Sequence, residues 1–371
     1  MSGSGSVRVL VVNAGSSSLK LTLLDGDDQV IAARELDARG DLDQAAVRDA
    51  LSAGLDAADA IGHRIVHGGE QFVAAVRVDA EVEAALRALT DLAPLHQPKS
   101  LTALDAVSAQ LPKIPAVARF DTAFHAGLPP AAATYALPAA WRERWPIRRY
   151  GFHGLSHSWV ARQAPQMLKR PPGGLRLVSC HLGAGASLCA ITDGRSVDTT
   201  MGFTPLEGLV MATRSGNVDP GLPLWLLQHT GITEGELASA LEHDSGLKGL
   251  AGSGDMRIVL ARAGDGDAAS TLALEVWAHR LRGLIAGMTA ALGGLDALIF
   301  TGGIGERSAP LRARAVQGLG FLGLAIDAER NQTAHGDREL TADGAMTRTL
   351  VIKAREDLEI ARQTRTVLTS W

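Results

Sequence analysis

The sequence predicts an α/β fold with two domains that arose by duplication of one unit. Its 371 residues suggest two domains at roughly 150 residues each. Apolar runs of strand length alternate with segments of helical periodicity, which is typical of α/β proteins. A strand–loop–strand–turn pattern also occurs twice, because Ser18-Leu19 and the Asp25-Gly26 turn correspond to Ser187-Leu188 and Asp193-Gly194, about 169 residues later.

Short apolar runs and one helical segment define the first half. The near-continuous apolar run 7–12 and the alternation 19–23 predict two strands around a glycine-serine turn. Polar and small residues fill 25–59, and a second apolar strand ends at 65–66. Residues 79–92 have helical spacing, with Glu81, Glu83 and Arg87 on the polar side and prolines following. The run 116–120 predicts a buried strand that ends at Asp121.

The second half repeats this style from about residue 150. Strands are expected at 175–180 and 188–191, with glycine turns between them. The apolar segment 281–292 predicts a helix, and 297–300 a strand. Ser308 is a candidate N-cap with Pro310 in the first turn. A last strand at 350–353 and a final helix at 357–368 complete the prediction.

Composition and charge exclude several classes of protein. Apolar residues make up 46% and charged residues 20%, so a disordered or fibrous chain is excluded. The net charge of −4 argues against a nucleic-acid or membrane-surface partner. Cys180 and Cys189 form no metal motif or disulfide framework, and no apolar run reaches the length of a membrane span. These features predict a soluble protein of the cytoplasm.

The strongest local signal is Asn13-Ala14-Gly15-Ser16-Ser17-Ser18-Leu19-Lys20, directly after the first strand. Backbone N–H groups, hydroxyls and one lysine are what a phosphate binds. The chain returns as a strand instead of entering a helix, so this is not a Walker loop. An ordinary serine-rich hairpin turn is the alternative.

Two further glycine-rich loops follow strands. Residues 181–187 place two glycines where backbone can approach an anion closely. Residues 302–306 lie between a strand and a helix start, a usual place for nucleotide contacts. Each alone could equally be a tight connection that binds no ligand.

Charged residues at strand ends supply candidate catalytic groups. Arg64 lies between His63 and His67, and a zinc site formed by these histidines has no evident third ligand. Asp121 and Glu356 follow strands, where each could also serve as a helix cap. The sequence has no Gly-x-Ser-x-Gly motif and no dinucleotide Gly-x-Gly-x-x-Gly motif that opens a helix, which disfavours hydrolases and dehydrogenases.

Together these segments resemble the acetate kinase family, within the superfamily of actin, sugar kinases and heat-shock ATPases. The resemblance runs in order from about residue 7 to 363. The matching segments are 13–20, 63–70, 93–98, 120–125, 150–154, 181–185, 201–208, 213–214, 253–257, 301–306 and Glu356. Eleven ordered matches make coincidence untenable for the set.

The resemblance implies a duplicated ribonuclease-H-like fold with an active-site cleft between the domains. The first domain would span 1–123, completed by a helix at 357–371, and the second, nucleotide-binding domain 124–356. The implied reaction is Mg²⁺-dependent, with Mn²⁺ as an alternative metal, and converts ATP and acetate to ADP and acetyl phosphate. A homodimer without nucleic-acid or membrane partners is expected.

The resemblance also implies roles for individual residues. Arg64 would bind the carboxylate, Arg214 the transferring phosphoryl group, and His153 an equatorial oxygen, while Asp121 would orient the arginine and metal-bound water. Asn13 and Glu356 would hold the metal, and Val66, Leu95, Phe152 and Pro205 would enclose the methyl group. The residues expected around ATP are Ser16, Ser18, Lys20, His181, Leu182, Gly183, Ala184, Gly185, Asp255, Met256, Arg257, Gly303, Ile304, Gly305, Glu306 and Arg307.

Some positions depart from the family pattern. Ala184 and Ala186 replace the usual Asn and Ser, and Arg307 stands where Asn or His is common. Val66 leaves less room than Ala, which favours acetate over propionate by the modest ~1–3 kcal/mol of one methylene. Three alternatives remain: a propionate or butyrate kinase, a pyrophosphate-using acyl kinase, and a non-catalytic nucleotide-binding protein.

Overall fold

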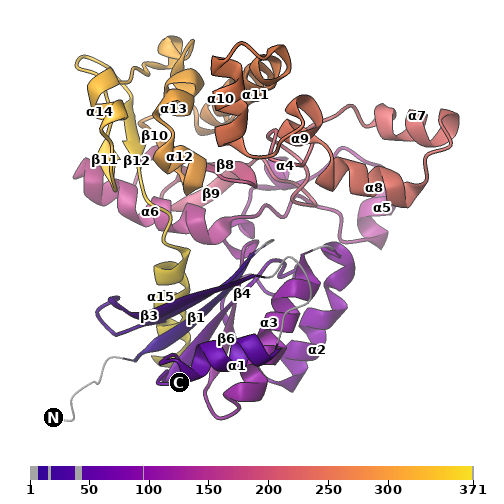
Figure 1. Ribbon diagram of the computed structural model, residues 1–371, viewed down its shortest axis with the longest axis vertical. Coiled ribbons are helices and arrows are strands. Elements are labelled where there is room, and N and C mark those ends of the chain that lie inside the picture. Colours follow the sequence, from indigo (N-terminus) through magenta and orange to yellow (C-terminus); the bar gives the residue numbers. More distant parts are fainter. Residues whose placement is uncertain (1–6, 16–17, 38–43, 95, 370–371) are drawn as a thin grey trace. The chain divides into compact units, whose positions relative to one another are not determined.

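The chain forms two compact units, each built from several segments. This computed structural model describes residues 7–15, 18–37, 44–94 and 96–369. Unit 1 comprises 1–126, 154–159 and 355–371, and unit 2 comprises 127–153 and 160–354. The chain therefore passes between the units four times, as the colours of Figure 1 allow the reader to follow. The expected domain boundaries at 123/124 and 356/357 stay a prediction.

Unit 1 is built on a six-stranded mixed sheet. Its strand order is β3-β2-β1-β4-β6-β5, with β1 antiparallel to β2 and parallel to β4, and β4 parallel to β6. The strands are β1 (Val9–Ala14), β2 (Ser18–Leu24), β3 (Val30–Asp37), β4 (Ala60–Ile65), β5 (Val76–Arg77) and β6 (Ala116–Phe120).

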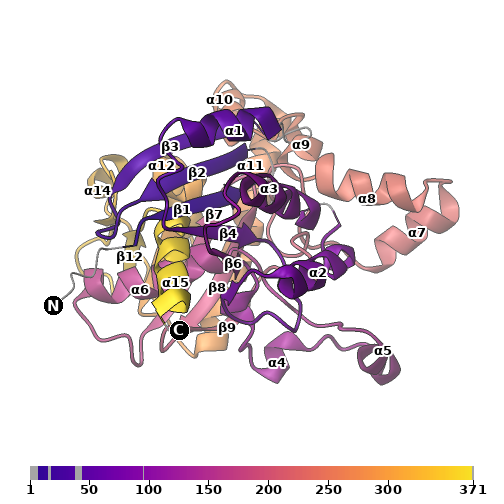
Figure 2. The same ribbon diagram turned by 90° about the horizontal axis from the view of Figure 1, so that it is seen from below.

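Helices cover both faces of this sheet. Leu10 and Val12 pack in one apolar cluster with residues of α1 (Gln44–Ser52) and α3 (Gln97–Gln110). Val9 and Val11 point to the opposite face, because side chains alternate along a strand. There they pack against α15 (Glu356–Thr369), which lies along β1 and β4 in Figure 2. Burial on both faces explains the continuous apolar run of β1.

The remaining helices of unit 1 are short. Asp79 caps α2 (Ala80–Ala88) by accepting from the Val82 N–H at 2.8 Å, which is the expected behaviour of an N-cap carboxylate. The 3₁₀ turns are η1 (Thr90–Leu92) and η2 (Ala123–His125).

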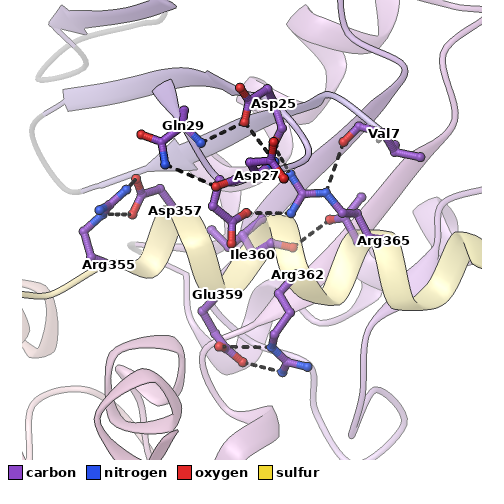
Figure 3. A network of polar contacts seen from close by, with 12 residues as sticks. Val7, Asp25, Asp27, Gln29, Arg355, Asp357, Glu359, Ile360, Arg362 and Arg365 are labelled. Atoms are coloured by element: carbon purple, nitrogen blue, oxygen red, sulfur yellow. Dashed lines mark hydrogen bonds and ion pairs between the residues drawn. The ribbon is translucent and has the colours of Figure 1, made fainter. Parts of the chain in front are cut away.

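Helix α15 is fixed to the sheet by close packing and by one arginine. A Cβ atom at Gly62 would lie 2.5 Å from Thr364 Oγ1 and 2.6 Å from Ile360 Cγ2, so only glycine permits this approach. Figure 3 shows Arg365 reaching back from α15 to the start of the chain, where it donates to the carbonyls of Val7 and Asp25 at 3.1 and 2.6 Å. The last helix of the chain thus completes the first sheet.

Unit 2 repeats the same sheet. Its order, β9-β8-β7-β10-β12-β11, matches that of unit 1 strand for strand, with the same parallel and antiparallel neighbours. This confirms the duplicated α/β fold. The strands are β7 (Arg176–Leu182), β8 (Ala186–Thr192), β9 (Arg195–Thr199), β10 (Ala297–Thr301), β11 (Arg338–Glu339) and β12 (Arg348–Val351).

Unit 2 also contains most of the helices. The longest, α11 (Ala268–Leu292), extends well before the expected start at 281, with Asp267 as its N-cap. The others are α4 (Pro130–Ala133), α5 (Ala139–Arg144), α6 (Gly154–Leu168, which begins in unit 1), α7 (Gly221–His229), α8 (Glu234–His243), α9 (Gly246–Ala251), α10 (Met256–Gly264), α12 (Gly302–Arg307), α13 (Ala309–Val316), η3 (Gly320–Leu322) and α14 (Ala328–Gln332). Within the described residues, the helices are all too short or too polar to cross a membrane.

The polar stretch 25–59 contains a strand and a helix that its composition did not predict. It contains β3, an edge strand whose side chains are mostly exposed, and α1, which buries only Val47, Ala50 and Leu51. An exposed edge strand needs no apolar alternation, so periodicity alone does not reveal it.

Candidate functional site

In unit 1, an arginine and two carboxylates gather at the ends of neighbouring parallel strands. Arg64 is on β4 and Asp121 directly follows β6, and the carboxyl ends of parallel strands meet at one edge of a sheet. Arg64 donates from Nε to both oxygens of Asp121, at 3.0 and 3.2 Å, and from Nη2 to Oδ2 at 2.6 Å. The fork geometry fixes the guanidinium plane.

Asn13 and Glu356 complete this cluster. Arg64 Nη1 donates to Asn13 Oδ1 at 3.0 Å, and Asn13 Nδ2 donates to Glu356 Oε2 at 2.9 Å. Glu356 Oε2 lies 3.8 Å from Arg64 Nη1. The structure therefore brings together the end of β1, β4, β6 and the first residue of α15, as the expected roles require.

Burial and charge act in opposite directions on this cluster. Burial raises the pKa of Asp121, whose side chain is only 2% exposed, while Arg64 opposes the shift. Burial alone would lower the pKa of Arg64, but Asp121 and Glu356 more than offset it and raise the pKa. Arg64 thus stays a cation, with a fixed charge available to an anionic ligand.

The donor set suits a hard cation. Asn13 and Glu356 offer an amide oxygen and a carboxylate, and Mg²⁺ prefers one or two protein oxygens with substrate phosphates and water. Three or more His, Cys, Asp or Glu side chains placed to hold a metal do not occur among the described residues. His63 and His67 are both buried, and burial lowers their pKa to about 3 and about 4.

The serine-rich hairpin is described only in part. The Gly15 N–H donates to the Ser18 carbonyl at 2.8 Å, and Lys20 is exposed on β2. The chain returns as a strand, as expected. Ser16 lies outside the described residues, as does Leu95 of the expected methyl pocket. Val66, the other pocket residue in unit 1, is buried.

In unit 2, the two candidate transfer groups His153 and Arg214 meet around Gly185. His153 stacks on His181 with ring centroids 4.3 Å apart, and its Nδ1 lies 2.9 Å from Ser187 Oγ. A Cβ atom at Gly185 would lie 3.3 Å from His153 Nε2 and 3.6 Å from Arg214 Nη1. Gly185 thus provides close approach of backbone to a histidine and an arginine, which suits an anion.

Arg214 is held in place by a carboxylate and a carbonyl. Its Nε lies 2.9 Å from Glu242 Oε2, and Nη1 donates to the Pro205 carbonyl at 3.3 Å. Both charged side chains are mostly buried, at 14% and 11% exposure. The pocket candidates of this unit, Phe152 and Pro205, are buried as well.

The remaining nucleotide candidates lie on two neighbouring turns. A Cβ atom at Gly302 would lie 2.8–3.1 Å from the Leu182 backbone, so the start of α12 lies beside the end of β7. Helix α12 contains Gly303, Ile304, Gly305, Glu306 and Arg307, and Ala184 is exposed in the facing loop. The Glu306 carboxylate accepts from the Ala354 N–H at 2.9 Å.

The turn before α10 approaches the same region. The Ala212 N–H donates to the Ala184 carbonyl at 3.0 Å, and a Cβ atom at Gly254 would lie 3.1 Å from the Ala212 carbonyl oxygen. Asp255 caps α10 and pairs with Arg257, whose side chain is 89% exposed. Met256, the first residue of α10, is buried.

Two residues that contact the site, Glu242 and Arg312, were not singled out in the sequence, and Ser187 was noted only as part of the repeat and of the loop 181–187. Glu242 anchors Arg214, and Ser187 contacts His153. Arg312 is fully buried and donates to the carbonyls of Gly305 and Glu306, both at 2.9 Å. These bonds fix the position of α12. Glu242 and Arg312 lie within helices, so no local motif marks them. The sequence signal that could have identified them is a polar residue at a position of the helix that faces the core.

Comparison with known proteins agrees with this geometry. The model of the acetokinase family matches residues 41–362. An acetate kinase of Leifsonia xyli is 46% identical, over 96% of this chain and 97% of that protein. An acetate kinase of Deinococcus radiodurans is 43% identical over 97% and 98%.

Solved structures give the same result. The acetate kinase of Porphyromonas gingivalis superposes with a TM-score of 0.89 at 33% identity, covering 98% of this chain and all of that one. A propionate kinase of Francisella tularensis superposes with 0.90 at 34% identity, over 97% of this chain and all of that one. On the family match, the relatives and the repeated sheets together, the chain belongs to the acetokinase family.

Proposed function

We propose that this chain transfers the γ-phosphoryl group of ATP, as its magnesium complex, to the carboxylate of acetate. The products are acetyl phosphate and ADP, and the reaction is reversible. Membership of the acetokinase family makes the chain a kinase that acts on acetate with ATP. The observation that supports the detailed proposal is Arg64, a mostly buried cation fixed by Asp121 and Asn13 beside Glu356.

The chemistry needs cations more than it needs a base. Acetate is already ionised at neutral pH, so no group must deprotonate it. The obstacle is repulsion between its carboxylate and the γ-phosphate, about 4 kcal/mol per pair at 4 Å and an effective dielectric of 20. Phosphoryl transfer is accelerated mainly by positioning and by stabilising charge.

The residues of unit 1 would hold the acceptor. Arg64 would bind the acetate carboxylate, and Asp121 would orient Arg64, since its oxygens already accept from that guanidinium. Asn13 and Glu356 fit a magnesium ion by their chemistry, and the ion would neutralise phosphate charge. Ser18 and Lys20, with Ser16 of the undescribed turn, would contact phosphate.

The residues of unit 2 would hold the donor. Arg214 would stabilise the transferring phosphoryl group, and His153 would donate to one of its equatorial oxygens. The loops around Gly183, Asp255 and Gly303 would enclose the nucleotide. Ala184 supplies only backbone groups there, and Arg307 adds a cation at the expected adenine side.

Propionate is the competing acceptor. The propionate kinase of Francisella tularensis is as similar in fold as the acetate kinases are. Val66 favours the smaller acid, because its side chain fills space that one more methylene would need.

We also propose that the protein is a cytoplasmic homodimer and that it accepts Mg²⁺ or Mn²⁺.

The first experiment measures acyl-hydroxamate formed from Mg·ATP and hydroxylamine with acetate, propionate or butyrate. We expect acetate to give the highest kcat/KM. A lead for propionate or butyrate would retain the chemistry and overturn the argument from Val66. Absence of product with every acid would contradict the proposed function, and repeating the assay with pyrophosphate would test the alternative donor.

A further inference from the structure

A partly buried polar cluster contacts the loop that carries Pro205. Tyr135, in the segment between α4 and α5, donates from its hydroxyl to Glu207 Oε2 at 2.5 Å. Arg149 Nη2 donates to the other oxygen, Oε1, at 2.6 Å. The guanidinium of Arg149 also lies over the Tyr135 ring, 5.5 Å from its centroid. We name Tyr135, Arg149 and Glu207 the loop triad.

The loop triad forms hydrogen bonds with the backbone of residues 200–203. The Phe203 N–H donates to Tyr135 Oη at 2.9 Å, and Arg149 Nη1 donates to the carbonyls of Thr200 and Met201 at 3.3 and 3.1 Å. A Cβ atom at Gly202 would lie 1.7 Å from Glu207 Oε2. The hydrogen bond between Tyr135 and Glu207 therefore fits beside residue 202 only because that residue is glycine.

The same loop holds the segment before α6. The Gly202 carbonyl accepts the N–H groups of Tyr150 and Gly151 at 3.0 and 3.2 Å, immediately before Phe152 and His153. Pro205 in turn offers its carbonyl to Arg214. This loop, residues 200–205, thus contacts the segment before Phe152 and also Arg214. The loop triad acts on these residues only through the loop.

We propose that Tyr135, Arg149 and Glu207 are positioning residues that hold Phe152 and Pro205, the residues of unit 2 expected to contact the methyl group, and so strengthen the preference for acetate over longer acids. This inference rests on the proposed function. Hydrogen bonds to a charged group are stronger than those between neutral groups, and the two oxygens of the partly buried Glu207 each accept one. Loosening these bonds frees the loop that positions Phe152 and Pro205, so we expect the loss to fall on acetate and to be smaller for propionate.

The test is Tyr135→Phe, which keeps the ring and removes the hydroxyl that joins Glu207 to the Phe203 N–H. We expect KM for acetate to rise about three- to tenfold, the range for one lost hydrogen bond. The ratio of kcat/KM for propionate to that for acetate should rise at least threefold. KM for ATP should stay within twofold of the parent value. Glu207→Gln, which retains the size and an acceptor, should show a smaller shift in the same direction.

Tyr150→Phe is the matched control, since it removes a hydroxyl that donates to the Pro146 carbonyl at 2.9 Å, outside the loop. An unchanged acid preference in Tyr135→Phe would overturn the inference. Equal loss with both acids and ATP, together with a lower melting temperature, would also overturn it, because it would show a merely structural role. Activity of the unmodified chain with acetate tests the proposed function separately.

Discussion

At the scale of single residues, Arg214 is the sharpest test of the transfer chemistry. We expect Arg214→Ala to lower kcat about 10²–10³-fold, the loss typical of removing one preorganised charge donor. KM for acetate and the affinity for Mg·ADP by calorimetry should change little. Arg348→Ala removes an exposed arginine paired with Glu339 and serves as the control. Undiminished turnover in Arg214→Ala would contradict the mechanism.

His63 gives the molecule a built-in sensitivity to acid. It is fully buried, and neither ring nitrogen has a partner among the described residues. Burial lowers its pKa from about 6.5 to about 3. The unfolded chain therefore binds a proton below about pH 6.5 that the folded chain does not, so stability falls as pH falls from 6.5 toward 3.

We expect this one group to cost about 2 kcal/mol of unfolding free energy between pH 7 and pH 5. His63→Leu should remove that part of the slope when urea unfolding is followed by circular dichroism at several pH values. The exposed His335→Leu is the control. An equal slope in His63→Leu and the parent chain would refute the assignment.

The sequence singled out four residues of unit 1 that the structure brings together, while their roles stay predictions. Asn13, Arg64, Asp121 and Glu356 each follow or end a strand, and the structure joins all four. In unit 2, the side chain that holds Arg214 could not be predicted in the same way. Glu242 contacts Arg214 across 28 residues of chain, and such a pairing follows from packing that no local pattern encodes.

At the scale of elements, the contact between β4 and α15 depends on a missing side chain. We expect Gly62→Ala to destabilise the protein by about 1–3 kcal/mol, since the added methyl would push Thr364 and Ile360 away from the sheet. Gly127→Ala adds the same methyl where nothing lies within 4 Å. Thermal unfolding of both variants checks this, and equal melting temperatures would show that α15 can shift freely.

Elements differed in how well the sequence predicted them. Central strands such as β1 and β10 are buried on both faces, so their apolar runs are evident. The edge strand β3 and the small helix α1 lack that signal. The first 13 residues of α11, more than three turns, were missed because Asp267 caps a helix whose early residues are mixed in character.

At the scale of the whole molecule, α15 makes unit 1 dependent on the far end of the chain. A chain that ends at residue 354 lacks Leu358 and Ile360, which pack on Val9 and Val11. Each buried aliphatic side chain contributes about 1.5–3 kcal/mol, so we expect this truncated chain to aggregate. A peptide of residues 355–371 should restore its solubility in part, measured by light scattering. The same peptide with Leu358→Asp and Ile360→Asp should not, and equal rescue by both would contradict the prediction.

This dependence has a consequence during synthesis on the ribosome. Residues 1–126 emerge first, but their sheet gains its second cover only after roughly 230 further residues. At about 5–20 residues per second, that interval is roughly 10–50 s. Throughout it Val9, Val11 and Leu24 lack the cover that α15 provides, and Leu155 and Trp159 are the cluster residues outside the first segment that have already been made. Unit 2 can therefore be complete before unit 1 is, and the nascent first sheet is where a chaperone would have its longest opportunity to bind.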